Sequence, residues 1–302
     1  MGKYAPLHIG HQRVIETAIA NTDETIVLVY DAPETTDVPL PIRADWIRAL
    51  YPEVDVIEVW GGPQEVGYTP AIKAAHEDCI KRVLNGRRVT HFFSSEPYGA
   101  HVSRSLAAAN CLVDLPRAHH PIAGNTIRTN PFAHRRWLSP LVYRDLVTNV
   151  VFLGGISTGK TTIAKRCAAH HCTGWMPEYG RTFWAEHQID HRLTPGQLVE
   201  IALTHVEQEE RRRLEANRYL FTDTNAITTA AFALHYHGTI PPEVTALAEA
   251  SRKRYDLVFV CDEDIPYDDT ADRSGAGVRH FLQEQTKALL DELQIPYRLL
   301  QG

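Results

Sequence analysis

The chain has 302 residues, of which 44% are hydrophobic and 23% are charged, and its formal net charge is −6 at pH 7. This composition is typical of a globular protein of about two domains, and the acidic balance argues against a nucleic-acid partner. No apolar run is long enough to span a membrane, and we expect no signal peptide. The five cysteines are scattered without a CxxC pair, so we expect reduced thiols and a cytoplasmic location rather than disulfides or zinc.

Apolar, β-rich runs alternate with helical patterns in the first half of the chain. The predicted strands are residues 25–30, 54–59, 89–93 and 111–113, and the predicted helices are residues 13–21, 43–50, 69–84 and 103–109. Such alternation predicts a parallel sheet with helices on both faces.

The segment 2–11 reads GKYAPLHIGH and runs directly into the first predicted helix. Two histidines spaced HxGH at a helix N-terminus suit a phosphate site, because imidazole N–H groups and the helix dipole stabilise negative charge. The full string resembles the GxFxPxHxGH signature of the nucleotidylyltransferase superfamily. This resemblance implies that His8 and His11 are catalytic and stabilise the α-phosphate in the transition state. The candidate cofactor-binding residues in the same loop are Gly2, Lys3 and Tyr4.

A second signature of that superfamily, ISxTxxR, is expected near the end of the same domain. Residues 122–128 read IAGNTIR, in which Arg128 supplies the phosphate-binding guanidinium. Ala123 and Asn125 replace the expected serine and threonine. The signature loop of the superfamily also follows a central apolar strand, whereas only Met1 precedes Gly2 here, so we expect an open apolar slot in the sheet. Either the true start lies upstream or this half is damaged.

A second series of strands and helices begins after a boundary within residues 141–149, which divides the chain into domains 1–147 and 148–302. The predicted strands are residues 150–153, a segment near 172–176, 219–222 and 257–261, and a helical segment covers 162–169. The predicted fold class is therefore α/β, with two doubly wound parallel-sheet domains.

Residues 154–161 read GGISTGKT, a complete match to the P-loop pattern GxxxxGK[ST] between a predicted strand and a predicted helix. In such a loop the backbone N–H groups surround a phosphate chain, Lys160 reaches the β- and γ-phosphates, and Thr161 holds Mg²⁺. We therefore expect ATP and Mg²⁺ as cofactors. The candidate cofactor-binding residues are Gly154, Gly155, Ser157, Thr158, Gly159, Lys160, Thr161 and Thr162.

A small-molecule kinase also needs a catalytic carboxylate, a carboxylate that holds the metal, and often a lid arginine. Glu178 follows the second predicted strand of this domain, Asp223 ends the strand 219–222, and Arg273 lies in the segment DDTADR beyond the strand 257–261. Asp223 stands at a position suited to Mg²⁺ or to the acceptor hydroxyl, and the assignment of the base between Glu178 and Asp223 is left open. Aromatic side chains nearby suit a flat, positively charged ring. The candidate substrate-binding residues are Tyr179, Arg181 and Tyr236.

Taken in order, these motifs resemble the NadR-type bifunctional family, in which a nicotinamide-nucleotide adenylyltransferase is fused to a ribosylnicotinamide kinase. The resemblance covers essentially the whole chain and includes RADWI at 43–47, SSEPYG at 94–99, PEYGR at 177–181 and DTN at 223–225. It implies that one half phosphorylates nicotinamide riboside to nicotinamide mononucleotide (NMN) and that the other half converts NMN with ATP to NAD and pyrophosphate. It also places Trp46 on the nicotinamide side of the adenylyltransferase, with Ser95 and Glu96 beside the nucleotide.

Three other functions are compatible with the sequence. The first is a ribosylnicotinamide kinase with an impaired adenylyltransferase half, which Ala123, Asn125 and the missing strand suggest. The second is an NAD- and ATP-binding regulator with little catalysis, and the third is a P-loop kinase for another nucleoside. The expected partners are small molecules, without nucleic acid or membrane, and a homo-oligomer is left open.

Overall fold

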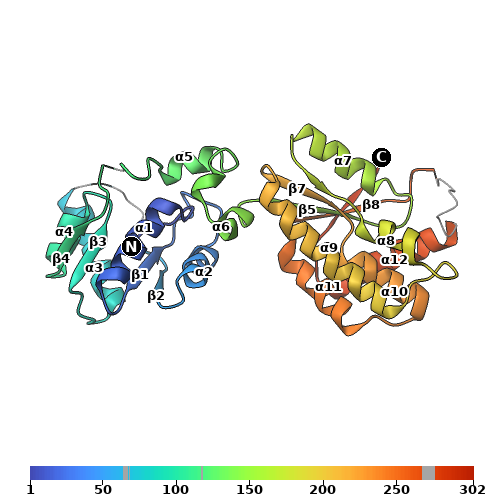
Figure 1. Cartoon of the computed structure of the whole chain (residues 1–302), viewed down its shortest axis with the longest axis horizontal. Coiled ribbons are helices and arrows are strands. Elements are labelled where there is room, and N and C mark those ends of the chain that lie inside the picture. Colours follow the sequence, from blue (N-terminus) through green and yellow to red (C-terminus); the bar gives the residue numbers. More distant parts are fainter. Residues whose placement is uncertain (64–66, 68, 117, 267–275) are drawn as a thin grey trace. The chain divides into compact units, whose positions relative to one another are not determined.

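The computed structural model describes every residue of the chain except 64–66, 68, 117 and 267–275. The chain divides into two compact units, Met1–Leu146 and Val147–Gly302 (Figure 1). All five cysteines are free thiols, as expected from their spacing. Within the described ranges, no helix combines the length and the apolar character needed to cross a bilayer.

The first unit alternates helices and short strands in the predicted order. Its elements are α1 (Ile9–Asn21), β1 (Ile26–Tyr30), α2 (Leu40–Leu50), β2 (Asp55–Val59), α3 (Pro70–Leu84), β3 (His91–Ser94), α4 (Gly99–Ser105), β4 (Ala109–Leu112), α5 (Gly124–Thr129), a 3₁₀ turn (Arg135–Trp137) and α6 (Pro140–Arg144). Each of the four predicted strands and four predicted helices overlaps an observed element, whereas α5 and α6 were not predicted.

The strands of the first unit form two separate parallel pairs, β1 with β2 and β3 with β4, instead of the single sheet expected from the sequence. Gly2 forms an isolated parallel bridge to Val29, in which its N–H donates to the Leu28 carbonyl oxygen and its own oxygen accepts from the Tyr30 N–H, both at 3.0 Å. A cavity of about 400 Å³ is lined by residues of both β1 and β3. The single sheet expected from the sequence is therefore interrupted among the described residues, and the cavity has the charged residues Asp23, Glu24 and Arg88 in its lining besides apolar ones.

One buried cluster nevertheless joins the two strand pairs. It contains Leu28, Tyr30, Val59, Cys79, Ile80, Leu84, Phe92 and Val102, contributed by β1, β2, β3, α3 and α4. Because this cluster contains residues of both strand pairs, hydrophobic packing connects the two pairs, although no backbone hydrogen bonds of a ladder join them among the described residues.

Arg43 of α2 fixes the opening loop of the first unit. Its side chain is almost fully buried, and it donates to the carbonyl oxygens of Lys3, Tyr30 (2.8 Å) and Val38 (3.0 Å). Burial lowers the pKa of Arg43, opposed by the nearby Asp31 carboxylate. This guanidinium therefore ties residue 3 to the end of β1 and to the start of α2.

The second unit has a regular α/β order. Its elements are β5 (Thr148–Leu153), α7 (Lys160–His170), β6 (Trp175–Met176), α8 (Tyr179–His187), α9 (Pro195–Glu215), β7 (Tyr219–Asp223), α10 (Ala226–His237), α11 (Pro242–Arg254), β8 (Leu257–Cys261), α12 (Ala276–Glu292) and β9 (Arg298–Leu300). Within the described residues, five parallel strands pair in the order β6-β7-β5-β8-β9, with β5 at the centre.

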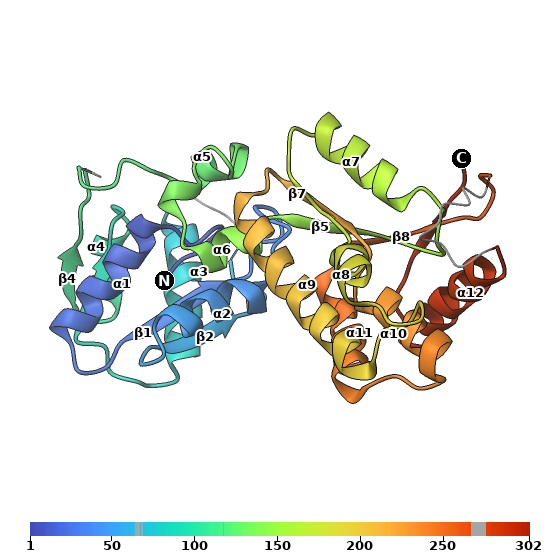
Figure 2. The ribbon, with the colours of Figure 1, turned by 45° about the vertical axis from the view of Figure 1, so that its right-hand side comes forward.

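The central strand β5 alternates between two cores, as a parallel strand buried on both faces does. Val150 and Phe152 pack with α7, whereas Val151 and Leu153 pack in a cluster with residues of α9, α10, α11 and α12. Figure 2 shows α7 apart from the layer formed by α9, α10 and α11. Helices thus cover both faces of this sheet, which confirms for the second unit the prediction of a parallel sheet between helices.

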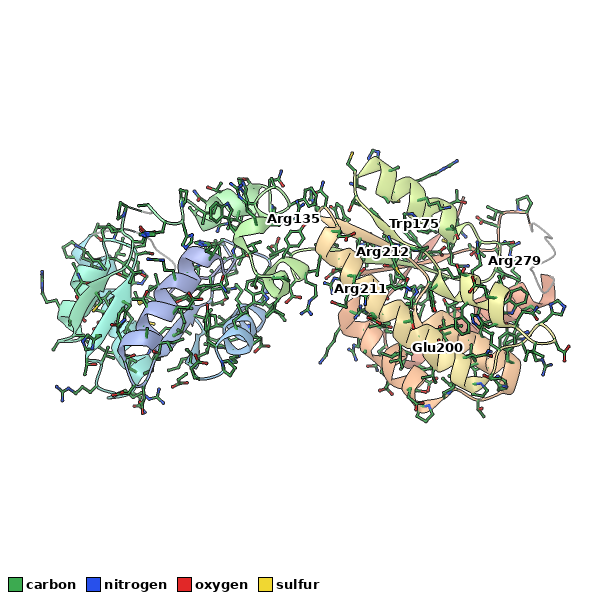
Figure 3. The ribbon with its side chains drawn as sticks, in the orientation of Figure 1. Arg135, Trp175, Glu200, Arg211, Arg212 and Arg279 are labelled. Atoms are coloured by element: carbon green, nitrogen blue, oxygen red, sulfur yellow. The ribbon has the colours of Figure 1, made fainter. Side chains whose placement is uncertain are left out.

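A buried polar network fixes α9 against α11 and β5. Glu209 is fully buried and accepts hydrogen bonds from Asn149, from Arg254 (3.1 Å) and from Tyr255 (2.7 Å). Near Glu209 on the same helix, Arg212 donates to the carbonyl oxygen of Trp175 in the edge strand β6 at 3.2 Å (Figure 3). Helix α9 is therefore anchored by polar contacts as well as by its apolar face.

Candidate functional site

The predicted strand–loop–helix context of the P-loop is present, since residues 154–159 connect β5 to α7. Gly154 (φ 126°), Ser157 (φ 57°) and Gly159 (φ 83°) adopt positive φ angles, which turn the loop around the start of α7. Helix α7 begins at Lys160 without a side-chain cap, so the positive end of its dipole faces the loop. This arrangement suits an anion such as a phosphate chain.

Lys160 and Thr161 both form hydrogen bonds at the start of α7. Lys160 is buried, and its ammonium donates to the carbonyl oxygen of Gly155 and to the Thr158 hydroxyl at 3.4 Å. The Thr161 hydroxyl donates to Oδ2 of Asp223, the last residue of β7. Oδ1 of Asp223 is buried and has no hydrogen-bond partner among the described residues. A hydroxyl beside a carboxylate with one free oxygen is a donor set that fits Mg²⁺.

A cavity of about 140 Å³ adjoins the P-loop. Ile156 and Ser157 of the loop contribute to its wall, together with Glu178, Arg181 and His205. Aromatic and polar side chains of α8 and α10 complete the wall: Trp184, Thr228, Thr229, Phe232 and Tyr236. The predicted residues Glu178, Arg181 and Tyr236 are therefore brought together with the loop in one enclosure.

Glu178 is the carboxylate that faces this cavity. Burial raises the pKa of Glu178, and the nearby Asp223 carboxylate raises it further, while Lys160 and Arg181 lower it. The Arg181 guanidinium lies 3.1 Å from the Glu178 carboxylate. A carboxyl group whose pKa lies above its ordinary value is suited to accept a proton from an acceptor hydroxyl at neutral pH.

His205 is a cavity residue that the motifs did not point to. It lies on α9 and is buried, and burial lowers its pKa while the Glu209 and Glu178 carboxylates raise it. Its Nε2 atom has no hydrogen-bond partner among the described residues. The one sequence feature that could have pointed to His205 is its place on the apolar face of a long helix. A histidine in such a place is more often a packed core residue than a ligand contact.

Other predicted residues of the second unit lie elsewhere. Tyr179 packs in a hydrophobic cluster with Phe183 and is not among the residues that line the cavity. Thr162 is exposed on α7. Gly155 differs from its prediction as a phosphate-binding residue, because its N–H donates to Gln283 of α12. Arg273 lies outside the described residues.

His8 and His11 of the first unit line a cavity of about 590 Å³. His8 caps α1, with its Nδ1 atom accepting the Gly10 N–H at 3.1 Å, and its ring stacks on His11 with the centroids 3.8 Å apart. Tyr4 meets His11 edge-on at 5.1 Å. Gly2, Lys3, Ser95, Glu96 and Arg128 also line this cavity. The structure therefore brings these predicted residues of the first unit together around one space.

Helix α5 approaches the histidine loop closely. Arg128 donates to the carbonyl oxygen of Ala5, and a Cβ atom on Gly124 would lie 3.2 Å from that oxygen. Ala123 stands at the N-cap without a side-chain hydrogen bond, and the Asn125 side chain accepts from the Thr126 N–H at 2.9 Å. The replaced signature residues thus leave the start of α5 without a hydroxyl cap, while Arg128 keeps its place near the loop.

Trp46 does not lie at the cavity. Its side chain is 1% exposed, and its indole N–H donates to Asp145 at 2.9 Å. Because α2 packs its apolar face inward, this ring lies in the core, and its contact with the nicotinamide group stays a prediction that this burial does not favour. The loop residue Lys3 pairs with Glu34 and donates to the Thr35 hydroxyl at 3.0 Å.

The chain is similar to the trifunctional NAD biosynthesis/regulator protein NadR of Salmonella typhimurium. The two are 29% identical over 286 residues, which cover 88% of this chain and 68% of the relative. Two crystal structures of NadR share the fold with a TM-score of 0.56. The complex with NR is 21% identical and covers 99% of this chain and 86% of its own chain. The complex with NAD and AMP-PNP is 22% identical, with 100% and 89% covered.

The second unit also matches a family model. The family model described as "AAA domain" matches residues 149–302, which is just over half of the chain and contains β5, the P-loop and the 140 Å³ cavity. The chain therefore belongs to this AAA domain family.

Proposed function

We propose that the chain is a NAD-salvage enzyme with two active sites. The second unit transfers the γ-phosphate of ATP to nicotinamide riboside and gives NMN. The first unit joins NMN to AMP from a second ATP and gives NAD and pyrophosphate. The observation that carries the proposal is the cavity beside the P-loop, where Glu178 and an aromatic wall meet Ser157.

In the kinase reaction, backbone N–H groups of the loop and Lys160 hold the triphosphate, because the loop and the start of α7 direct positive charge toward it. Glu178 accepts the proton of the acceptor hydroxyl, whose oxygen bonds to the γ-phosphorus as the bond to ADP breaks. Thr161 and Asp223 would hold Mg²⁺, which supplies charge neutralisation on the phosphates. This arrangement favours Glu178 as the base, because it lines the cavity whereas Asp223 binds the loop.

The acceptor is a nucleoside with a flat, cationic base. Trp184, Phe232 and Tyr236 provide ring faces in the cavity, and a pyridinium is a favourable partner for such faces. The similarity to NadR, and the NadR structure in complex with NR, support nicotinamide riboside over another nucleoside.

In the first unit, the phosphate of NMN attacks the α-phosphorus of ATP and pyrophosphate leaves. His8, His11 and Arg128 surround the cavity where this charge would develop, so their role is to stabilise it by hydrogen bonding. Support comes from the similarity to NadR and from its structure with NAD and AMP-PNP.

The two reactions can be separated in one preparation. The purified chain is incubated with Mg-ATP and either nicotinamide riboside or NMN, and the products are resolved by chromatography. NAD is expected from NMN, and both NMN and NAD are expected from the riboside. Lys160→Ala is expected to abolish only the riboside reaction, and His11→Ala only the formation of NAD. Loss of both reactions in either folded variant would contradict two independent sites.

A second candidate is a ribosylnicotinamide kinase with an impaired first unit. The specific observation in its favour is the cavity of about 400 Å³ lined by β1 and β3, since an interrupted sheet positions the histidine loop less firmly. In the same assay this candidate gives NMN from the riboside and no NAD from NMN.

A further inference from the structure

Gln283 lies at the contact between the P-loop and helix α12. Its side chain is fully buried. Its Oε1 atom accepts the Gly155 N–H at 2.7 Å, and its Nε2 atom donates to the carbonyl oxygen of Cys261, the last residue of β8, at 3.1 Å. One carboxamide therefore satisfies two backbone groups that lie more than 100 residues apart in the sequence.

The backbone around these two bonds is packed without spare room. A Cβ atom on Gly154 would lie 2.7 Å from the Cys261 oxygen and 2.9 Å from Oε1 of Gln283. A Cβ atom on Gly155 would lie 2.5 Å from the carbonyl oxygen of Arg279, one turn before Gln283 on α12. Figure 3 labels Arg279 on this helix. The first two residues of the loop are therefore set by α12 and not only by β5.

The glutamine carboxamide supplies both required groups at this position, one acceptor and one donor. A carboxylate offers acceptors alone, so it would place a negative charge against the Cys261 carbonyl oxygen, which is also an acceptor. An apolar side chain of similar length would leave the Gly155 N–H and the Cys261 oxygen buried without partners, which is costly.

We propose that Gln283 is a positioning residue of the P-loop: by holding Gly155 against the end of β8 it sets the affinity of the second unit for Mg-ATP. The proposal rests on the proposed role of the P-loop in binding ATP, but not on the identity of the acceptor. Gln283 acts through the loop backbone and touches no phosphate itself.

The test compares Gln283→Met and Gln283→Glu with Gln285→Met, a matched change of a partly buried glutamine on the same helix. Binding of Mg-AMP-PNP is read as hydrogen-exchange protection of the peptide that contains residues 154–161. The Kd is expected to rise about tenfold in Gln283→Met, in line with the loss of a buried hydrogen bond, and to stay within twofold in Gln285→Met. The KM for the riboside is expected to change less than the KM for ATP.

The glutamate variant gives a readout that a general loss of packing does not. A protonated glutamic acid carries one donor and one acceptor, so it restores the pattern of the carboxamide. The Kd of Gln283→Glu relative to the unaltered chain is therefore expected to fall as the pH is lowered. If Gln283→Met does not fold, the pH dependence of the Kd of Gln283→Glu tests the proposal by itself. A Kd within twofold in Gln283→Met, an equal effect in Gln285→Met, or a pH-independent ratio overturns the proposal. Absence of riboside phosphorylation with normal AMP-PNP protection instead refutes the proposed acceptor.

Discussion

Replacing Tyr255 by phenylalanine tests the buried polar network beneath the kinase cavity. Glu209 is 0% exposed, and its Oε2 atom receives the Tyr255 hydroxyl at 2.7 Å, while Oε1 receives Asn149 and Arg254. Burial raises the pKa of Tyr255, and the Glu209 carboxylate raises it further, so the phenol stays protonated as a donor. Removing this hydroxyl leaves half of a buried carboxylate without its donor.

The expected cost follows from the charge of the acceptor. A hydrogen bond to a charged group contributes about 1.5–3 kcal/mol, and full burial of Glu209 favours the upper part of this range. With a urea m-value of about 2 kcal/mol/M, the unfolding midpoint of the second unit should fall by about 1 M. Glu209→Ala should cost more, about 3–5 kcal/mol, because it leaves the Arg254 guanidinium without this partner.

Pulse proteolysis along a urea series measures this midpoint, with the fragments assigned to the second unit by mass. Tyr297→Phe is the matched control, because Tyr297 packs beside the same core and no hydrogen bond joins its hydroxyl to another of the described residues. Its midpoint is expected to stay within 0.2 M of the unaltered chain, on the order of the error of such titrations. Equal midpoints for Tyr255→Phe and Tyr297→Phe would refute the reasoning, since the hydroxyl would then contribute nothing to the stability of the unit.

Three further outcomes are expected. As the pH is lowered, kinase turnover should begin to fall at a pH above the ordinary carboxylate range, because the pKa of Glu178 is raised and only its deprotonated form accepts a proton. Arg181→Gln removes a group that lowers this pKa, so it should move the acid limb of the rate–pH profile to higher pH. An unmoved limb would count against Glu178 as the base. Gly155→Ala places a methyl group against a backbone carbonyl of α12 and should cost about 1–3 kcal/mol and weaken AMP-PNP protection, whereas Gly174→Ala, in open space, should do neither. Trp46→Phe should destabilise the first unit by about 1 kcal/mol and leave the KM for NMN unchanged; a raised KM would return this ring to the cavity.

Local patterns predicted β5, α7, β6, β7 and β8 of the second unit, but not the helices α8 to α12 or the strand β9. The run 150–153 followed by GGISTGKT predicts strand, loop and helix together, and the observed β5 and α7 differ from the predicted bounds by one or two residues. The strand at Leu257–Cys261 was predicted with its observed bounds. Such signals succeed because glycine requirements and apolar runs depend on neighbouring residues. Helix α9 was missed although Thr194 and Gln197 form a capping box, a signal that is visible in the sequence.

The residues that the sequence did not reveal act across long chain separations. Gln283 meets Gly155 over 128 positions, and nothing in the sequence around either residue marks the pair. The burial of Trp46 is also a tertiary fact, because an aromatic residue on an amphipathic helix suits a core and a ligand wall equally well. Strand pairing in the first unit is also a tertiary property. The alternation of strands and helices predicts a parallel sheet, but it does not tell whether all four strands pair in one sheet or in two separate pairs.

The P-loop and the histidine loop of this chain are supported in different ways. The P-loop extends β5, which is paired on both sides and buried on both faces, and Gln283 binds it from a third direction. The histidine loop instead follows a single bridge at Gly2 and is held by the buried Arg43 through the Lys3 carbonyl. Arg128 of α5 also donates to this loop, at the Ala5 carbonyl oxygen. The histidine loop is therefore held mainly by side chains, whereas the P-loop continues a strand of a parallel ladder. Positioning of His8 and His11 therefore depends on side chains of α2 and α5, whereas positioning of Lys160 depends on the central strand β5 together with Gln283 of α12.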